Sequence, residues 1–129
     1  ARKSRGLGDV YKRQVYTSRA GTGKTECANI TFEAPSLRYD EGGYWSITAY
    51  SSQGWLMTNN NSADSTTSTP NKDGSYTIHF APKGQTCDAA SNVIEVNDDG
   101  WNFAVRAYRP SNEAVASGEM HNFPQVTAK

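Results

Sequence analysis

Three features that mark common protein classes are missing from this 129-residue sequence: a long apolar run, an excess of one charge, and a cluster of metal-ligating residues. Apolar residues occur only in short runs, whereas a helix needs about 20 of them to cross a bilayer. Two cysteines and two histidines without a CxxC pair make a structural zinc site implausible. Residues 15–129 carry 12 acidic and 8 basic residues, which argues against nucleic-acid binding. We therefore expect no membrane span, no metal, no cofactor and no nucleic-acid partner.

Catalytic signatures are missing as well. The sequence contains no GxSxG elbow, no HExxH pair and no Cys–His nucleophile motif. His79 is expected on the outward face of a strand, with no acid or nucleophile at motif spacing, so a solvated or capping histidine is favoured over a general base. Paired carboxylates that meet only in the fold are still compatible with the sequence. On balance we favour a protein that is not an enzyme.

The stretch AGTGKTE (20–26) ends like a phosphate-binding loop. Such a loop has a first glycine five residues before the second, but Ser18 stands at that position. It also needs a helix directly after the lysine, so that backbone N–H groups face the phosphates. The residues that follow, ECANITF (26–32), are typical of a strand instead. We interpret the stretch as a turn that connects two strands of a hairpin.

Residues 1–14 carry five basic residues and one acid, and differ from the rest of the chain. The sequence GLGDVYKRQ (6–14) resembles a translated sequencing-adapter tail of the kind that recurs in gene predictions from environmental DNA. A nucleic-acid-binding arm and a targeting peptide are the alternatives, but a secretory signal would need an apolar stretch after the charges. We therefore treat 1–14 as a non-native head and 15–129 as a single domain that is truncated at its N-terminus.

Cys27 and Cys87 are the only thiols of the chain. A single long-range disulfide and two unrelated buried thiols are both compatible with their positions, and the redox compartment decides between them. For the localisation we favour the periplasm or secretion.

Alternating apolar and polar residues predict strands along most of the chain. The clearest are YWSITAY (44–50), SYTIHF (75–80) and WNFAVRAY (101–108), and WLMT (55–58) is expected to form a hairpin with the first of them. Only SNEAVAS (111–117) has a helical pattern. About seven short strands between Gly- and Asn-rich turns predict an antiparallel sandwich or barrel. The expected core residues are Trp45, Ile47, Ile78, Phe80, Phe103 and Val105.

Two polar segments invite a binding interpretation. Residues 59–74 are rich in Asn, Ser and Thr, and we expect them to form one long exposed loop. Asp73, Asp98 and Asp99 could supply oxygen ligands to calcium. They also stand beside glycines, where Asp and Asn stabilise tight turns by bonding their own backbone, and no EF-hand spacing is present. The turn interpretation is favoured for these aspartates.

The ordered segments resemble a known family. YWSITAY together with QGWLMTN, then NKDGSYTIHF, SNVIEV with DGWNFAVRAYRP, and GEMHNFPQV follow, in order, the motifs of the DUF1214 domain, whose role is uncharacterised and which is often found behind a DUF1254 domain. The resemblance covers about three quarters of the chain. It implies an all-β, jelly-roll-like β-sandwich, here without the leading residues of the family.

Four residues are candidate ligand contacts. The resembled family keeps an Arg and a Tyr at the positions of Arg106 and Tyr108, which share one strand face. An arginine there could clamp a carboxylate or stack on Tyr44 or Tyr50. A structural role, in which it binds a neighbouring loop carbonyl, is favoured, because one strand arginine does not by itself indicate a ligand. Trp55, beside a turn, is the tryptophan expected to be exposed. The candidate binding set is therefore Arg106, Tyr108, Trp55 and Tyr50, with no catalytic and no metal-binding residues.

The sequence supports two functional hypotheses. The first is a non-catalytic module of a larger protein that binds a small molecule or a glycan, or that self-associates or packs on a neighbouring domain. The second is an enzyme domain acting on carbohydrate or another small polar substrate. A deep pocket that joins two acids, or an acid and His79, favours the enzyme, whereas an aromatic face favours the module.

Overall fold

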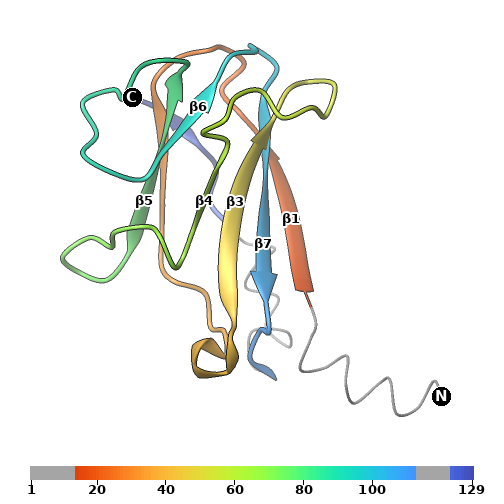
Figure 1. Cartoon of the computed structure of the whole chain (residues 1–129), viewed down its shortest axis with the longest axis vertical. Coiled ribbons are helices and arrows are strands. Elements are labelled where there is room, and N and C mark those ends of the chain that lie inside the picture. Colours follow the sequence, from red (N-terminus) through yellow and green to blue (C-terminus); the bar gives the residue numbers. More distant parts are fainter. Residues whose placement is uncertain (1–13, 113–122) are drawn as a thin grey trace.

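The computed structural model describes residues 14–112 and 123–129, and the regular secondary structure within them consists almost entirely of strands joined by loops (Figure 1). A 3-10 turn, η1 (Tyr39–Glu41), is the one helical element bounded within these residues. The predicted helical turn at 111–117 lies mostly outside the described residues, and the second histidine of the chain, His121, lies wholly outside them. The strands are β1 (Gln14–Ala20), β2 (Ala28–Phe32), β3 (Tyr44–Tyr50), β4 (Ser62–Asp64), β5 (Tyr76–Pro82), β6 (Val93–Val96), β7 (Asn102–Tyr108) and β8 (Thr127–Ala128).

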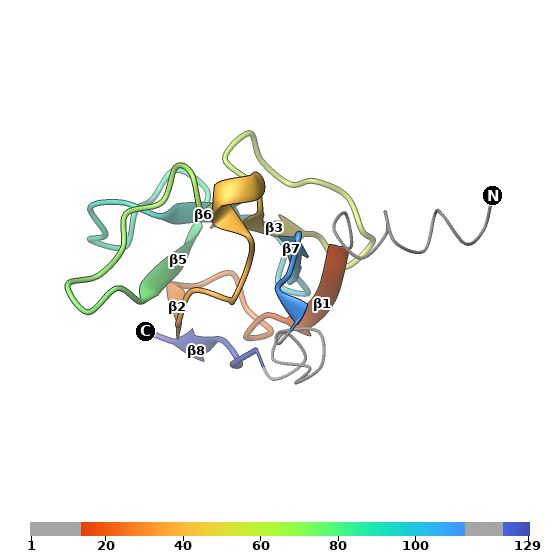
Figure 2. The same cartoon turned by 90° about the horizontal axis from the view of Figure 1, so that it is seen from below.

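The strands form two four-stranded sheets that pack face to face, as Figure 2 shows from below. One sheet has the order β1-β7-β3-β4 and the other β6-β5-β2-β8. Neighbours are antiparallel except β5 and β6, which are parallel. The prediction of an all-β sandwich is therefore confirmed, with one parallel pair inside it. No helix in the described part of the chain has the length and hydropathy needed for a bilayer crossing.

The core lies between the sheets and contains the residues that strand alternation predicted. Trp45, Ile47, Ile78, Phe80, Phe103 and Val105 are all at most 1% exposed. Aromatic rings join the two layers: the Phe80 and Trp101 centroids lie 4.7 Å apart, and those of Phe32 and Trp45 lie 5.0 Å apart. Because one face of each strand is buried, a one-residue slip would expose this set, so the register is strongly specified.

Two predictions for the region after β3 are wrong. Residues 55–58 form no strand, and β3 instead pairs with β4 in the middle of the segment that was expected to be one exposed loop. Ala63 of β4 is only 7% exposed. The segment 55–58 closes a turn, because the Ser51 N–H donates to the Trp55 carbonyl at 2.8 Å. Ser-Ala-Asp carries little strand propensity, so β4 exists because of its partner strand rather than its own sequence.

The stretch 20–26 connects the two sheets and is not a hairpin, since β1 and β2 lie in different layers. Strand β2 follows it, where a phosphate-binding loop would require a helix. The Lys24 carbonyl accepts a hydrogen bond of 2.9 Å from the indole Nε1 of Trp101, and the Thr25 N–H donates to Asp99 Oδ1 at 2.7 Å. These bonds hold the turn against the end of the core.

Cys27 and Cys87 form a disulfide, which decides between the two alternatives left by the sequence. Cys27 directly precedes β2, and Cys87 lies in the connection between β5 and β6. That connection returns the chain to run parallel to β5, and the amide of Asn92 also fastens it by donating to the carbonyls of Thr69 and Thr77. The disulfide thus ties the connection between β5 and β6 to the start of β2.

Candidate functional site

The outer face of the β1-β7-β3-β4 sheet gathers four tyrosines and an arginine. Alternation turns Arg106 and Tyr108 of β7 away from the core, together with every second residue of β1 and β3. The register places Tyr108 opposite Tyr44, and Arg106 opposite Tyr16 on one side and Ser46 on the other. We call this surface the tyrosine face; it consists of Tyr16, Tyr44, Tyr50, Tyr108 and Arg106.

Arg106 is the centre of the tyrosine face. Its guanidinium carbon lies 5.1 Å from the ring centroid of Tyr16 and 6.0 Å from that of Tyr50, both within the range of cation–π contacts. The side chain is half-buried. Within residues 14–112 and 123–129 it forms no hydrogen bond and no ion pair. The structural role favoured from the sequence, in which Arg106 binds a loop carbonyl, is therefore not seen in the described residues.

Tyr44 and Tyr108 stack on each other at one end of the face. Their centroids are 4.4 Å apart and their planes differ by 22°. Burial raises the pKa of Tyr44, and the neighbouring Tyr108 raises it further. Of the two stacking partners expected for Arg106, Tyr50 forms a cation–π contact with it, whereas Tyr44 stacks on Tyr108 instead. Tyr16 takes the place that Tyr44 was expected to fill.

Tyr16 was missed as a site residue, although the alternation of QVYTSRA (14–20) predicts that it lies on the same side as Ser18. It is 51% exposed, and Tyr44 is 37% exposed. The residues between the rings are small: Ala104 stands between Ser18 and Thr48 in the register. Side chains of this size leave the neighbouring rings accessible on the outer side of the sheet.

Asp64 lies at the other edge of the same sheet, opposite Ser46 in the row that contains Arg106. Burial raises the pKa of its carboxyl, but hydrogen bonds from Thr66 and Thr67 outweigh this effect, and the pKa is lowered overall. The Oδ1 atom accepts from the Thr66 N–H at 2.8 Å and from the Thr67 N–H at 3.0 Å. This carboxylate is thus ionised and occupied by its own turn, so it does not pair with Arg106, and no other acid of the described residues does.

Trp55 does not belong to the tyrosine face. It lies in the loop after β3 and is 71% exposed, as expected, and the adjacent Leu56 is 58% exposed. The structure therefore brings Arg106, Tyr108 and Tyr50 onto one face but leaves Trp55 in a separate place. Close to that loop is a cavity of about 390 Å³, lined by residues 56–59 and by Asn61, Lys83 and Glu95. No single sequence motif connects these segments.

The three aspartates considered as calcium ligands each accept a hydrogen bond from a backbone N–H group. Asp98 Oδ2 accepts from the Ser52 N–H at 2.5 Å, Asp99 Oδ1 accepts from Thr25, and Asp73 Oδ1 accepts from the Ser75 N–H at 3.0 Å. Among the residues that the structure describes, no group of three His, Cys, Asp or Glu side chains is arranged to hold a metal. Asp73 thus bonds the backbone of its own turn, as the turn interpretation predicts, whereas Asp98 and Asp99 attach their turn to distant loops.

The Asp98 turn predicts a pH effect. The Ser52 N–H holds the pKa of Asp98 below its ordinary value of 3.8. A carboxyl with a lowered folded-state pKa stabilises the fold above its unfolded pKa, and this stabilisation is lost as the pH falls through the folded pKa. We expect Asp98→Asn to be less stable than the wild type near neutral pH and to match it at strongly acidic pH. Urea unfolding midpoints between pH 2 and 7 measure the difference. An equal difference at every pH would contradict this account.

His79 differs from its expected solvated or capping state. It is half-buried on the outer face of the second sheet, opposite Asn29, and its Nδ1 atom is buried without a hydrogen-bond partner. Burial lowers the pKa of the imidazole, and the charge of Lys129 lowers it further. The ring is therefore neutral at physiological pH. It does not line the cavity beside Glu95.

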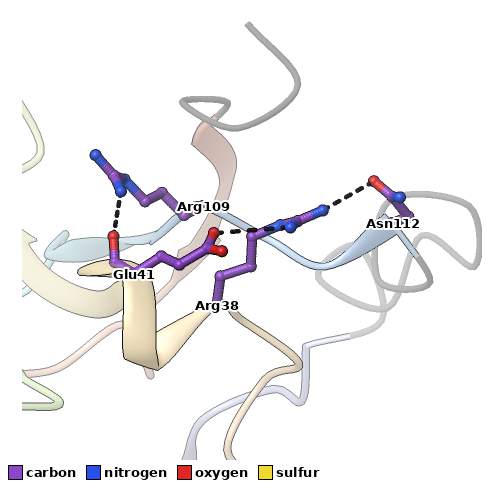
Figure 3. A network of polar contacts seen from close by, with 4 residues as sticks. All are labelled: Arg38, Glu41, Arg109 and Asn112. Carbon is purple, nitrogen blue, oxygen red and sulfur yellow. Dashed lines mark hydrogen bonds and ion pairs between the residues drawn. The ribbon is translucent and has the colours of Figure 1, made fainter. Parts of the chain in front are cut away.

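A polar network that the sequence did not reveal fastens η1 to the residues after β7 (Figure 3). Arg109 Nη1 donates to the Glu41 carbonyl, Arg38 forms an ion pair of 3.7 Å with the Glu41 carboxylate, and Arg38 Nη2 donates to Asn112 Oδ1 at 3.3 Å. Arg109 has a positive φ of 57°, which is uncommon outside glycine. Because all four residues bind one another, we assign this network a structural role, which is to attach η1 to the residues that follow β7.

Comparisons with solved structures agree with the fold. The VPA0106 protein from Vibrio parahaemolyticus superposes with a TM-score of 0.73 at 22% identity, over 92% of this chain and 31% of that chain. A putative uncharacterized protein from Burkholderia cenocepacia gives a TM-score of 0.57 at 15% identity, over 78% of this chain and 26% of that one. The chain thus spans less than a third of the length of either protein. A search of curated proteins found no match.

The sequence itself places the chain in a family. The family described as "Protein of unknown function (DUF1214)" matches residues 15–112, which include strands β2 to β7 and all of β1 except its first residue. The motifs of β3, β5 and β7 that resemble this family all lie within the matched residues. The chain belongs to the DUF1214 family.

Proposed function

We propose that this domain is a non-catalytic binding module of a larger protein, and that the tyrosine face is its binding surface for a carboxylate-bearing ligand. The observation that carries the proposal is the Arg106 guanidinium, which is half-buried between Tyr16 and Tyr50 and has no hydrogen-bonding partner in the described residues. An arginine fork matches the two oxygens of a carboxylate. Tyrosine rings on either side would add apolar contact and stacking.

The length of the matched structures supports the proposal that this domain is part of a larger protein. This chain covers 31% and 26% of the two solved proteins, so its fold occurs there within much longer chains. The Cys27–Cys87 disulfide supports an oxidising compartment, such as the periplasm or the extracellular space, because cytosolic thiols are kept reduced. In this proposal the domain contributes a ligand-binding face to a larger secreted or periplasmic protein.

The enzyme alternative ranks second because the cavity does not meet its criterion. That criterion was a pocket joining two acids, or an acid and His79. The cavity of about 390 Å³ contains one acid, Glu95, and not His79. Asp64 stands on the same sheet face as Arg106, but its carboxylate is occupied by Thr66 and Thr67. The module hypothesis requires only the side chains of the tyrosine face.

A thermal-shift screen with acetate, succinate and benzoate tests the proposal. We expect benzoate to raise the unfolding temperature most, because it joins a carboxylate to an aromatic ring, and a ligand stabilises the state that binds it. Arg106→Gln should weaken the affinity at least about tenfold, the usual value of a charged hydrogen bond. Arg106→Lys should restore only part of it, because an ammonium lacks the fork geometry.

Two controls make the result specific. Lys72→Gln removes an exposed cation in a turn far along the chain from β7, and it should leave benzoate binding unchanged. Benzamide, which keeps the ring but loses the charge, should produce no comparable shift. If Arg106→Gln bound benzoate as well as the wild type does, the tyrosine face would not be the binding surface.

A further inference from the structure

The cavity beside Trp55 lies where the edges of the two sheets meet, away from the tyrosine face. It is formed by the loop that leads from β3 to β4, by Lys83 at the end of β5, and by Glu95 of the edge strand β6. The Glu95 N–H donates to the Asn60 carbonyl at 2.9 Å, which attaches the loop to β6. Because the β3–β4 loop meets residues of β6 and of the end of β5 there, only the folded chain creates the cavity.

Backbone and amide contacts fix the walls of this cavity. The Asn97 amide donates to the Met57 carbonyl at 3.3 Å, and the Asn61 amide donates to the Thr58 carbonyl at 2.7 Å. Thr58 Oγ1 in turn donates to the Glu95 carbonyl at 3.4 Å. A loop tied at successive residues is ordered before any ligand arrives, which lowers the entropic cost of binding.

Three polar side chains that line the cavity are unpaired in the part of the chain that the structure describes. Within the described ranges, the carboxylate of Glu95, the ammonium of Lys83 and the amide of Asn59 form no hydrogen bond and no ion pair. Glu95 can only accept hydrogen bonds, Lys83 can only donate them, and Asn59 can do both. The two opposite charges face one cavity without neutralising each other, so a purely anionic or purely cationic ligand would meet a repulsive group.

Apolar surface stands beside these groups. Leu56 and Met57 line the cavity, and the neighbouring Trp55 has 71% of its surface exposed. A sugar presents both chemistries at once, since its hydroxyls donate and accept while the C–H groups of its ring contact aromatic and aliphatic side chains. A volume of about 390 Å³ is at the small end of ligand pockets, which start at roughly 300 Å³.

We infer that this cavity is a second binding site, and that it takes a neutral mono- or disaccharide. The sugar hydroxyls donate to Glu95 and accept from Lys83, Asn59 bridges two of them, and the ring packs toward Leu56. This inference does not depend on the tyrosine face, because the two sites share no residue.

NMR titration of the full chain with N-acetylglucosamine, galactose and cellobiose tests the inference. We expect at least one of these sugars to bind, and Glu95→Gln and Asn59→Ala each to weaken it at least about tenfold. Glu33→Gln makes the same chemical change at an exposed acid outside the cavity and should bind like the wild type. Circular dichroism of each variant verifies the fold.

Trp55 provides a second measurement. Trp45 and Trp101 are at most 1% exposed, so acrylamide quenches the fluorescence of Trp55 selectively. The bound sugar should protect Trp55 from quenching in the wild type and in Glu33→Gln, but not at the same concentration in Glu95→Gln. The inference would be overturned if no sugar bound, if glycine or succinate alone bound, or if both cavity variants kept the wild-type affinity.

Discussion

Replacing both cysteines, in Cys27→Ala/Cys87→Ala, should lower the free energy of unfolding by about 2–4 kcal/mol. The disulfide joins residues 60 apart in the sequence and therefore removes many conformations from the unfolded chain. A loss of this size is a large share of the roughly 5–15 kcal/mol that stabilises a domain. Urea unfolding followed by circular dichroism measures it, with the slope of the transition reported beside its midpoint.

The reductant gives the matched control for this experiment. Dithiothreitol should shift the unfolding midpoint of the wild type to that of the double variant and should leave the variant unchanged. The loop between β5 and β6 should respond first, since Cys87 is one of the points that attach it. A wild type whose midpoint is the same with and without reductant would show that the bond contributes no stability.

Trp101→Ala should destabilise the fold by about 3–5 kcal/mol, the range for emptying the site of a large buried aromatic. Trp101 is 1% exposed and contacts Phe80 at 4.7 Å between centroids. Its indole Nε1 also donates to the Lys24 carbonyl, so the turn at 20–26 loses its attachment in the same variant. Thermal and urea unfolding give the size of the loss.

Two further variants separate the ring from the turn. Lys24→Ala keeps the carbonyl that Trp101 binds, and it should change stability by less than about 0.5 kcal/mol. Gly21→Ala would place a methyl group 2.4 Å from the Trp101 ring, so it should destabilise by about 1–3 kcal/mol through overpacking. If Lys24→Ala cost as much as Trp101→Ala, the lysine side chain would have a role that this account does not give it.

The parts of the fold that could be predicted are those with a strong local pattern. Period-two alternation in 44–50, 75–80 and 101–108 fixed both the strand type and the buried face, because each of these strands has one face in the core. The pairing of strands could not be obtained this way. Strand β4 has three residues and no apolar alternation, and the sheet to which β1 or β2 belongs depends on contacts far along the chain.

The candidate site shows the same division. Arg106 and Tyr108 could be placed on one face from their spacing, and the family resemblance drew attention to them. Their partners come from other strands, so Tyr16 beside Arg106 and Tyr108 against Tyr44 follow only from the register of β1-β7-β3. The cavity at Glu95 could not be predicted from the sequence because its lining joins three separate segments. Cysteine pairing likewise depends on where β2 and the β5–β6 loop meet.

The most direct test of the binding-module account is a map of benzoate contacts by ¹⁵N NMR on the full chain. The account predicts that the Arg106 Nε–H and the amides of Tyr16 and Tyr50 show the largest shift changes, saturating together with one dissociation constant. The same titration of Arg106→Gln should lose these changes while the rest of the spectrum stays that of a folded protein. Shift changes confined to other surfaces, or an Arg106 signal unaffected at saturating benzoate, would contradict the assignment of the tyrosine face as the ligand-binding surface.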